Sequence, residues 1–268
     1  MTGSGCLRFA SLGSGSRGNA LIIEAHATNS DVRPTRVLVD CGFSLREIAA
    51  RLARHKLTPD DLDAILVTHE HSDHSAGVFK CARRHDIEVI LTRGTLAAFP
   101  CDRGELPRLR AIDSHQAIIV GALTVQPFPV PHDAREPVQY VFSFGARKLG
   151  VLTDAGSVTP HMVEMLDGCE GLFLEFNHDV DMLAAGRYPQ VLKQRILGRF
   201  GHLDNRQAES LLGQIDKSRL RHVVAAHLSE QNNTPDLVRT ALERVLGDAG
   251  VAIRVANQDE GSEWCELS

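Results

Sequence analysis

Short runs of aliphatic residues alternate with amphipathic stretches along most of the chain, and this pattern predicts its secondary structure. Single strands are predicted over residues 7–12, 20–24, 36–40, 62–68, 88–92, 138–144, 148–152, 171–176 and 221–229, with paired strands within 117–129 and the last strand at 251–255. Helices are predicted after residue 44 and over 76–85, 159–166, 207–215 and 237–246. Strands that alternate with helices indicate an α/β fold, and two stacked sheets flanked by helices, in the order αββα, accommodate the pattern best.

The first predicted helix carries its own start signal. Ser44 is the expected N-cap, and Glu47, three residues later, is its capping-box partner. Ile48, Leu52 and Leu57 follow at helical spacing and are expected to form its apolar face.

The strongest chemical signal follows the apolar run at 62–67. Residues 67–74 read Val-Thr-His-Glu-His-Ser-Asp-His, and imidazole and carboxylate are ligands that suit zinc, manganese or iron(II). His69 and His71, two apart, project to the same side of an extended chain and can bind one ion. Asp73 and His74 lie one turn further on and can reach a second ion. A zincin motif is excluded, because it needs a histidine where Asp73 stands.

Further potential ligands follow other apolar runs. His132, Asp154 and His227 each stand where a strand-like run ends. The carboxyl ends of strands meet at one edge in an α/β fold, so these side chains are expected to converge on the motif at 69–74. Seven potential ligands are too many for one tetrahedral ion, so the pattern predicts two divalent metal ions.

Length and composition bound the class of protein. The 268 residues contain no linker, so we expect a single domain over residues 1–268. Lysine plus arginine number 29 against 34 aspartate plus glutamate, and this net charge of −5 argues against a constitutive nucleic-acid coat but allows a local basic groove. Six scattered cysteines favour a reducing cytoplasm. No apolar run reaches the roughly 18 residues that span a bilayer, so no membrane location is expected.

The His-x-His-x-Asp-His motif of residues 69–74 resembles, residue for residue, the signature of the metallo-β-lactamase-fold hydrolases. Within that superfamily the chain is similar to the YycJ or WalJ group and, more distantly, to tRNase Z and the PhnP-type phosphodiesterases. The finer likeness rests on residues 11–19, 175–179, 201–205 and 226–233. The resemblance covers nearly the whole chain and implies a four-layer αββα fold.

The resemblance also implies roles for the potential ligands. The family's site has three ligands for each of two ions and one carboxylate shared by both. By this resemblance the ligands of the first ion would be His69, His71 and His132, and those of the second would be Asp73, His74 and His227. Asp154 would be the carboxylate shared by both ions.

A proton donor is implied as well. In tRNase Z-like enzymes a Gly-His turn pairs with a glutamate after the preceding strand and protonates the leaving oxygen, and His202 and Glu175 occupy those places here. Without the resemblance, a histidine in such a turn is more often an ordinary loop residue. Asp73, His202 and Glu175 are therefore the predicted catalytic residues.

Substrate contacts are predicted from the glycine- and serine-rich segment at 13–19. This segment fits a hairpin turn and, equally, a functional loop whose backbone N–H groups, with Arg17 and Asn19, face an anionic substrate. Ser14 and His178 complete the expected substrate-binding set, although His178 also fits a position behind the metal ligands or a solvated one.

The expected function is that of a metal-dependent phosphodiesterase in which a hydroxide held by two metal ions, zinc or manganese with iron left open, attacks phosphorus. A nuclease acting on DNA or RNA is favoured, because tyrosine can stack a base and cations can hold phosphates. The segment at 181–199 supplies such residues near the site: Arg187, Tyr188, Lys193, Arg195 and Arg199. The alternatives are a small cyclic or nucleotide phosphodiesterase, a thioester or lactam hydrolase, and a non-catalytic metal-binding protein. A homo-oligomer is left open.

Overall fold

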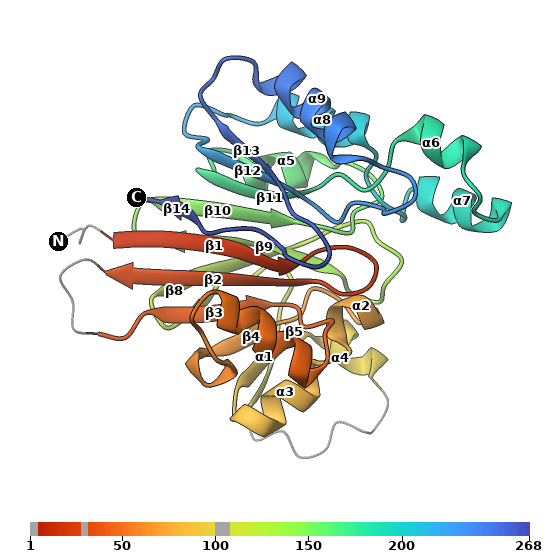
Figure 1. Cartoon of the computed structure of the whole chain (residues 1–268). Coiled ribbons are helices and arrows are strands. Elements are labelled where there is room, and N and C mark those ends of the chain that lie inside the picture. The colour runs from red at the N-terminus through yellow and green to blue at the C-terminus, as the bar shows by residue number, and fades with distance from the viewer. Residues whose placement is uncertain (1–4, 28–31, 100–107) are drawn as a thin grey trace.

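The computed structural model describes residues 5–27, 32–99 and 108–268, and within them two seven-stranded sheets stack face to face (Figure 1). The first sheet has the order β14-β1-β2-β3-β4-β5-β6 and the second β13-β12-β11-β10-β9-β8-β7. The first contains β1 (Gly5–Gly13), β2 (Ala20–Ala27), β3 (Thr35–Val39), β4 (Ala64–Leu66), β5 (Glu88–Thr92), β6 (Leu109–Ile112) and β14 (Cys265–Leu267). The second contains β7 (Ile118–Val120), β8 (Leu123–Pro129), β9 (Val138–Phe144), β10 (Arg147–Leu152), β11 (Gly171–Glu175), β12 (His222–Ala226) and β13 (Ala252–Val255).

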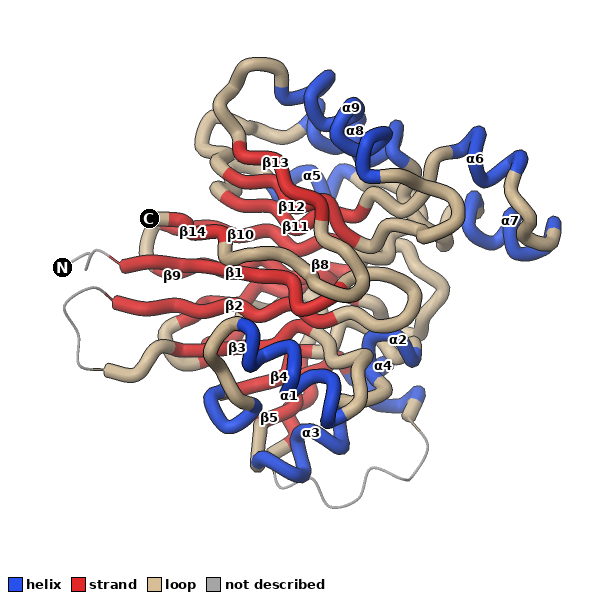
Figure 2. Tube along the Cα trace, viewed as in Figure 1, coloured by secondary structure: helices blue, strands red, loops and turns tan. Residues whose placement is uncertain are grey.

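Helices cover both outer faces, which confirms the predicted αββα order (Figure 2). The helices around the first sheet are α1 (Leu45–Arg54), the 3-10 turn η1 (Pro59–Asp61), α2 (Ser72–Ser75), α3 (Val78–His85) and α4 (Arg93–Ala98). Those on the side of the second sheet are α5 (Pro160–Leu166), α6 (Val180–Ala185), α7 (Gln190–Leu197), α8 (Asn205–Gln214) and α9 (Pro235–Leu246). No helix among the described residues is long and apolar enough to cross a membrane.

Successive side chains of a strand point to opposite faces, so each sheet contributes both to the layer between the sheets and to a layer under its helices, which makes three apolar layers. On β3, Val37 and Val39 point into the layer between the sheets, whereas Leu38 points outward under the helices. On β11, Phe173 lies between the sheets and Leu172 faces the outer helices. Because both faces of these strands are buried, they appear in the sequence as continuous aliphatic runs.

The start of α1 is as predicted. The Ser44 side chain accepts a hydrogen bond from the backbone N–H of Glu47, and the Glu47 carboxylate accepts one from the backbone N–H of Ser44. The Ser44 hydroxyl also donates to the Glu47 carboxylate, and this bond, together with that from the Ser44 backbone N–H, lowers the pKa of Glu47. The helix ends at Arg54, so Leu57 is buried beyond it and not on its apolar face, where it was expected.

Parallel strands bring the carboxyl ends of many elements to one edge. Strands β3 to β6 run parallel in the first sheet, and β10 to β13 run parallel in the second. Their carboxyl ends lie on the same side as the loop from β1 to β2, at the right of Figure 1. Polar residues that follow these strands are therefore gathered there.

One prediction about the strands was wrong, and two short helices were not predicted. Residues 251–255 are not the last strand, because β14 follows and pairs antiparallel with β1, with Leu7 opposite Leu267. A strand of three residues is too short to show a period. The polar stretch after residue 180 folds into α6 and α7, and α7 has no buried residue that would have given it an apolar stripe in the sequence.

Candidate active site

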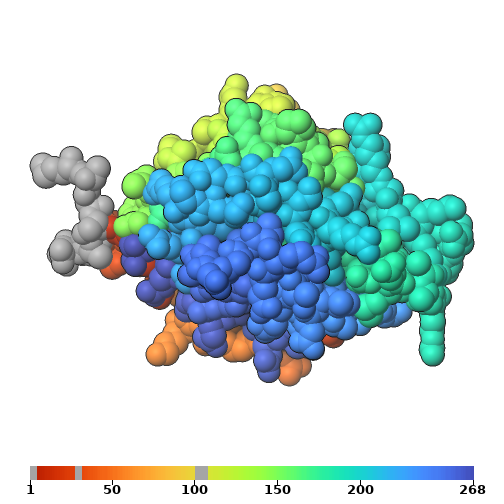
Figure 3. Space-filling view, turned by 90° about the horizontal axis from the view of Figure 1, so that it is seen from above, coloured from red at the N-terminus to blue at the C-terminus, as the bar shows by residue number. Residues whose placement is uncertain are grey.

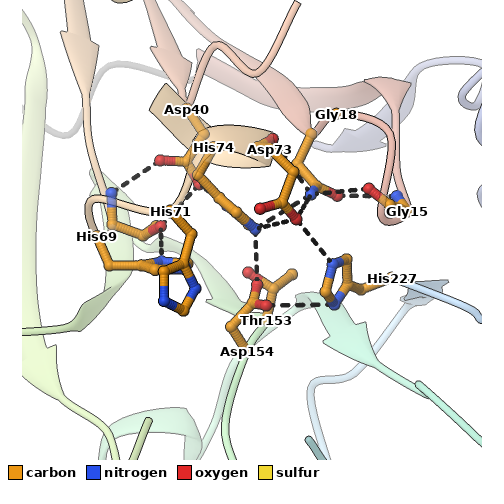
Figure 4. Close-up of polar contacts among 12 residues, drawn as sticks. Gly15, Gly18, Asp40, His69, His71, Asp73, His74, Thr153, Asp154 and His227 are labelled. Atoms are coloured by element: carbon orange, nitrogen blue, oxygen red, sulfur yellow. Dashed lines mark hydrogen bonds and ion pairs between the residues drawn. The ribbon is translucent and has the colours of Figure 1, made fainter. Parts of the chain in front are cut away.

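Four segments bring the potential ligands together at this edge, and Figure 4 shows those from three of them, with His69 to His74, Asp154 and His227 labelled. His69 and His71 follow β4, and the short helix α2 carries Asp73 and His74. His132 follows β8, Asp154 follows β10 and His227 follows β12. The candidate ligand atoms lie within 4.8 Å of one another in each of two sets, which are His69, His71 and His132, and Asp73, His74 and His227.

Asp154 lies between the two sets and is 2% exposed. Its Oδ2 is 3.1 Å from Nε2 of His74, and its Oδ1 is 4.0 Å from Nε2 of His132. This carboxylate is therefore within reach of both sets of candidate ligands.

The histidines are oriented by hydrogen bonds that point away from the site. Nδ1 of His132 donates to the Gly201 carbonyl at 3.0 Å, and Nδ1 of His227 donates to Oε1 of Glu175 at 3.0 Å. Nδ1 of His74 donates to Oδ2 of Asp40 at 2.8 Å. A neutral imidazole that donates through Nδ1 presents its Nε2 lone pair on the other side, so these rings turn their lone pairs into the site.

Asp40 was not singled out from the sequence, yet it fixes two of the candidate ligands. Besides accepting from His74, its Oδ2 accepts from Oγ1 of Thr68 at 2.8 Å. That hydroxyl in turn lies 2.9 Å from Nδ1 of His69 and accepts its proton. The signal was present, because Asp40 directly follows β3 as the other site residues follow their strands.

The residues present fit divalent cations. Nε2 of His227 is buried and has no hydrogen-bond partner, although buried polar atoms are normally paired, and Oδ2 of Asp154 has only Nε2 of His74 facing it, at 3.1 Å. Nε2 of His69 and of His132 lie 3.0 and 3.3 Å from Nδ1 of His71, an arrangement in which lone pairs face one another. Nitrogen and oxygen donors in this arrangement suit zinc, manganese or iron(II).

In the metal-free site, the pKa is lowered for two of the candidate histidine ligands and raised for two others. Burial lowers the pKa of His69 and of His132. Burial would also lower the pKa of His74 and His227, but carboxylates led by Asp154 outweigh it, raising that of His74 well above its usual value and that of His227 to about 10. Burial would raise the pKa of Asp154, but His227 and His74 outweigh it and hold it well below its usual range.

His202 is held against a buried carboxylate beside the ligand sets. Nδ1 of His202 donates to Oε1 of Glu175 at 2.9 Å, and Oε2 of Glu175 accepts from the backbone N–H groups of Ala155 and Leu203 at 3.0 and 3.1 Å. Burial would raise the pKa of Glu175, but His202 and His227 lower it to about 2. The carboxylate therefore stays charged and keeps the proton on Nδ1, which leaves Nε2 of His202 available for exchange.

A cavity of about 420 Å³ opens over these groups. One wall consists of site residues that include His71, Asp73, Asp154, His202 and His227. The facing wall comes from α7 and the loop before it, and Asp133 and Asn177 also line the cavity. The sequence did not mark Asp133 or Asn177, because each is a single polar residue beside a stronger candidate.

Residues 35–227 match the model of the β-lactamase superfamily domain. The chain belongs to the β-lactamase superfamily. It is 35% identical over 249 residues to "Exodeoxyribonuclease YycJ" of Bacillus anthracis, with 92% of each chain covered. It is 33% identical to "Exodeoxyribonuclease WalJ" of Streptococcus pneumoniae, with 92% of this chain and 91% of that one covered. These likenesses confirm the resemblance seen in the sequence.

Solved structures of the β-lactamase superfamily show the same fold. The metallo-β-lactamase fold protein YhfI from Bacillus subtilis superposes with a TM-score of 0.74 at 14% identity, covering 98% of this chain and all of that one. A diphosphatase from the PhnP family superposes with a TM-score of 0.68 at 18% identity, covering 98% and 97%. The family match and the two exodeoxyribonuclease relatives show that the chain is an enzyme, a metal-dependent hydrolase of the fold that binds divalent metal.

In this β-lactamase superfamily member the glycine- and serine-rich segment packs against the segments that carry the candidate ligands. The backbone N–H of Asn19 donates to the Asp73 carbonyl at 2.7 Å, and Nδ2 of Asn19 is 3.1 Å from Nε2 of His74. Oγ of Ser14 accepts from the backbone N–H of His227 at 2.8 Å. Ser14 and Asn19 are buried, so the segment is both a hairpin connection and a support for ligand-bearing segments.

The four residues expected to bind substrate do not line the cavity. Ser14 and Asn19 contact the ligand-bearing segments, and Arg17 is paired with Glu230 at 2.8 Å and with Asp259 at 3.2 Å. His178 is 1% exposed, its main chain bridges to Asp204, and burial lowers its pKa. None of these four residues is therefore placed to contact a substrate in this cavity.

Proposed function

We propose that this hydrolase is a nuclease, a phosphodiesterase that cleaves a DNA or RNA strand with the help of two divalent metal ions. The observation that carries the proposal is the pairing of His202 with the buried Glu175 beside both ligand sets. An alkoxide leaving group of a nucleic acid needs a proton, and this pair holds an imidazole where it can supply one. The names of the curated relatives, both exodeoxyribonucleases, support the same reading.

The ligand sets define what each residue would do. His69, His71 and His132 would hold one ion and Asp73, His74 and His227 the other, with Asp154 between them. When bound, the ions would supply an activated water and neutralise charge on the phosphate oxygens. The chain's own task is to position the diester, to keep Nδ1 of His202 protonated through Glu175 and to deliver a proton from Nε2.

We propose zinc or manganese as the metal, with iron left open, because the donors are imidazole nitrogens and carboxylate oxygens. Elemental analysis of the purified protein should find close to two ions per chain. Asp73→Ala should lose one ion and most activity while the far-UV circular dichroism of the fold is kept. A protein that binds no metal, even after reconstitution with zinc or manganese, would contradict the proposal.

The role of His202 is tested by changing the leaving group. His202→Ala should keep its metal and lose on the order of 10²- to 10⁴-fold in turnover on nucleic acid, the range for one proton-transfer group. The loss should be far smaller on bis-p-nitrophenyl phosphate, because p-nitrophenolate departs without a proton. His71→Ala should lose metal and fail on both substrates, and His115→Ala, on the surface away from the ligands, is the matched control.

The cavity also suits a second candidate, a phosphodiesterase of small cyclic or nucleotide diesters, because about 420 Å³ is within the size of pockets that enclose small ligands. Parallel assays on linear DNA, linear RNA and cyclic nucleotides at several salt concentrations separate the two candidates. Efficient cleavage of a cyclic diester at high salt, with DNA and RNA left intact under every metal, would replace the nuclease by this candidate.

We further propose that residues 1–268 form one domain located in a reducing cytoplasm. The layer between the sheets takes side chains from both of them, which supports a single domain. The described cysteines are free, including the neighbouring Cys41 and Cys81, which supports a reducing compartment. Cys101 lies outside the described residues.

A further inference from the structure

Residues 180–197, here called the arm, comprise α6, a short loop and α7. The arm extends beyond the sheets at the edge that carries the site, and it forms the right end of the molecule in Figures 1 and 3. None of the residues of α7 is buried. Packing against the core does not explain the residues on the surface of such a helix.

One side of the arm faces the cavity. Leu192, Arg195 and Ile196 line it from one face of α7, at spacings of three and four residues from Leu192, and Tyr188 lines it from the loop before that helix. Three of these four side chains offer apolar or aromatic surface. The wall opposite the metal ligands is therefore apolar, with one cation set into it.

The position of that cation is fixed by Asp133. Nε of Arg195 donates to Oδ2 of Asp133 at 2.6 Å, and Oδ1 of Asp133 lies 3.5 Å from Nε2 of His132. Among the described residues, the two terminal nitrogens of this guanidinium have no protein partner. Arg195 thus stands close to a candidate ligand set with its terminal N–H groups free for an anion.

We propose that the cavity-facing side of the arm is a nucleotide subsite, in which Arg195 binds the phosphate next to the scissile one and Tyr188, Leu192 and Ile196 contact the face of its base. The inference rests on the proposed nuclease function and adds a substrate form to it. An apolar wall accepts any base, so recognition does not depend on sequence. The face of a base is free only when the base is unpaired and unstacked, so the occupied strand is single.

Lys193 provides a matched control on the same helix. Its Nζ donates to the Ala184 carbonyl at 2.6 Å, within the arm, and it does not line the cavity. Lys193 and Arg195 carry the same charge two residues apart. If the arm bound nucleic acid only through its positive charge, Lys193 and Arg195 would both contribute to binding. The proposed subsite requires Arg195 alone.

The test measures binding by the full chain with its metal ions. Fluorescence anisotropy follows a labelled single-stranded oligothymidylate with phosphorothioate linkages, which slow its cleavage, and the same strand in a duplex. Arg195→Ala should weaken binding of the single strand about tenfold and make the slope of log affinity against log salt shallower by about one. Lys193→Ala should change neither, and Arg195→Lys should recover the salt slope but only part of the affinity.

Tyr188 gives the second arm of the test. Tyr188→Ala should weaken single-strand binding about tenfold with no change in the salt slope, and Tyr188→Phe should restore it, because only the ring is needed. Equal effects of Arg195→Ala and Lys193→Ala, or duplex binding as tight as single-strand binding, would overturn the subsite. If the wild-type chain neither binds nor cleaves nucleic acid, the nuclease proposal falls and the subsite falls with it. If it does both while Arg195→Ala behaves as Lys193→Ala, only the subsite falls.

Discussion

Three residues at the site have a left-handed backbone that side chains other than glycine rarely adopt. The φ angles are 61° at Asp40, 51° at Asp154 and 56° at His227. Each residue ends a strand, and the turn aims its side chain into or behind the metal site. Aspartate and histidine tolerate this conformation better than branched residues, and such strain is commonly kept where function requires it.

Asp40 orients two candidate ligands, so its loss should reach the metal. Asp40→Ala removes the hydrogen-bond acceptor of His74 and breaks the series of hydrogen bonds from His69 through Thr68 to Asp40. We expect metal affinity to fall about 10- to 100-fold, the usual effect of removing such a partner. Competition with a chromophoric chelator measures it, and Asp248→Asn, on the exposed surface, is the control. Unchanged affinity in Asp40→Ala would show that the ligands orient themselves.

Metal binding should release protons from the second ligand set. In the metal-free chain the pKa of His227 is about 10 and that of His74 is also raised, so both are protonated at pH 7. A metal ion needs the neutral imidazole, so binding should release about two protons per chain and should tighten as pH rises from 7 toward 10. Calorimetric titration in buffers of different ionisation enthalpy counts these protons. A count near zero would mean that the carboxylates do not hold the two histidines charged.

Single site residues could be predicted from the sequence where a side chain suited to metal binding directly follows a strand. The potential ligands could be predicted because each follows an aliphatic run, and the structure gathers them in two sets. Asp40 and Asp133 could not be singled out, since their roles depend on which side chains the fold brings beside them. The same reason explains why the side chain of Asn19, expected at the substrate, lies beside Nε2 of His74.

Among the elements, α7 should be the least protected helix. It has no buried residue, whereas α8 and α9 bury apolar side chains against the second sheet. Hydrogen exchange followed by mass spectrometry should find the amides of α7 exchanging faster than those of α8 or α9. Addition of the phosphorothioate strand should slow exchange in α7 and leave α9 unchanged. Exchange in α7 as slow as in α9, without ligand, would contradict this ranking.

Element prediction succeeded where burial shapes the sequence and failed where it does not. The strands at 171–176 and 221–229 appear as aliphatic runs because both faces are covered. In α7, Leu192 and Ile196 face the cavity, but Val191, 79% exposed, and Leu197, 49% exposed, face solvent, so its apolar residues are spread around the helix and mark no single buried face. β14 depends on a partner at the other end of the sequence.

In the whole molecule, a buried side-chain hydrogen bond joins the two sheets next to the metal motif. The hydroxyl of Tyr140, on β9 of the second sheet, donates to the Val67 carbonyl of the first at 2.8 Å. Tyr140→Phe leaves that buried carbonyl unpaired and should lower the free energy of unfolding by about 1–3 kcal/mol. Urea denaturation measures the loss. Tyr188→Phe, at the surface of the arm, should change the free energy of unfolding little. An equal loss in both variants would show that the bond from Tyr140 does not stabilise the fold.

The pairing of β14 with β1 has a consequence for the chain while it is being made. β1 leaves the ribosome early, but β14 follows every other strand in the sequence. The nascent first sheet therefore carries an open edge for most of its synthesis, and an open edge can pair with the strand of another chain. Arg8 lies on that edge, beside Glu24 and opposite Glu266 in the finished sheet. A charge at this position discourages aggregation until β14 arrives.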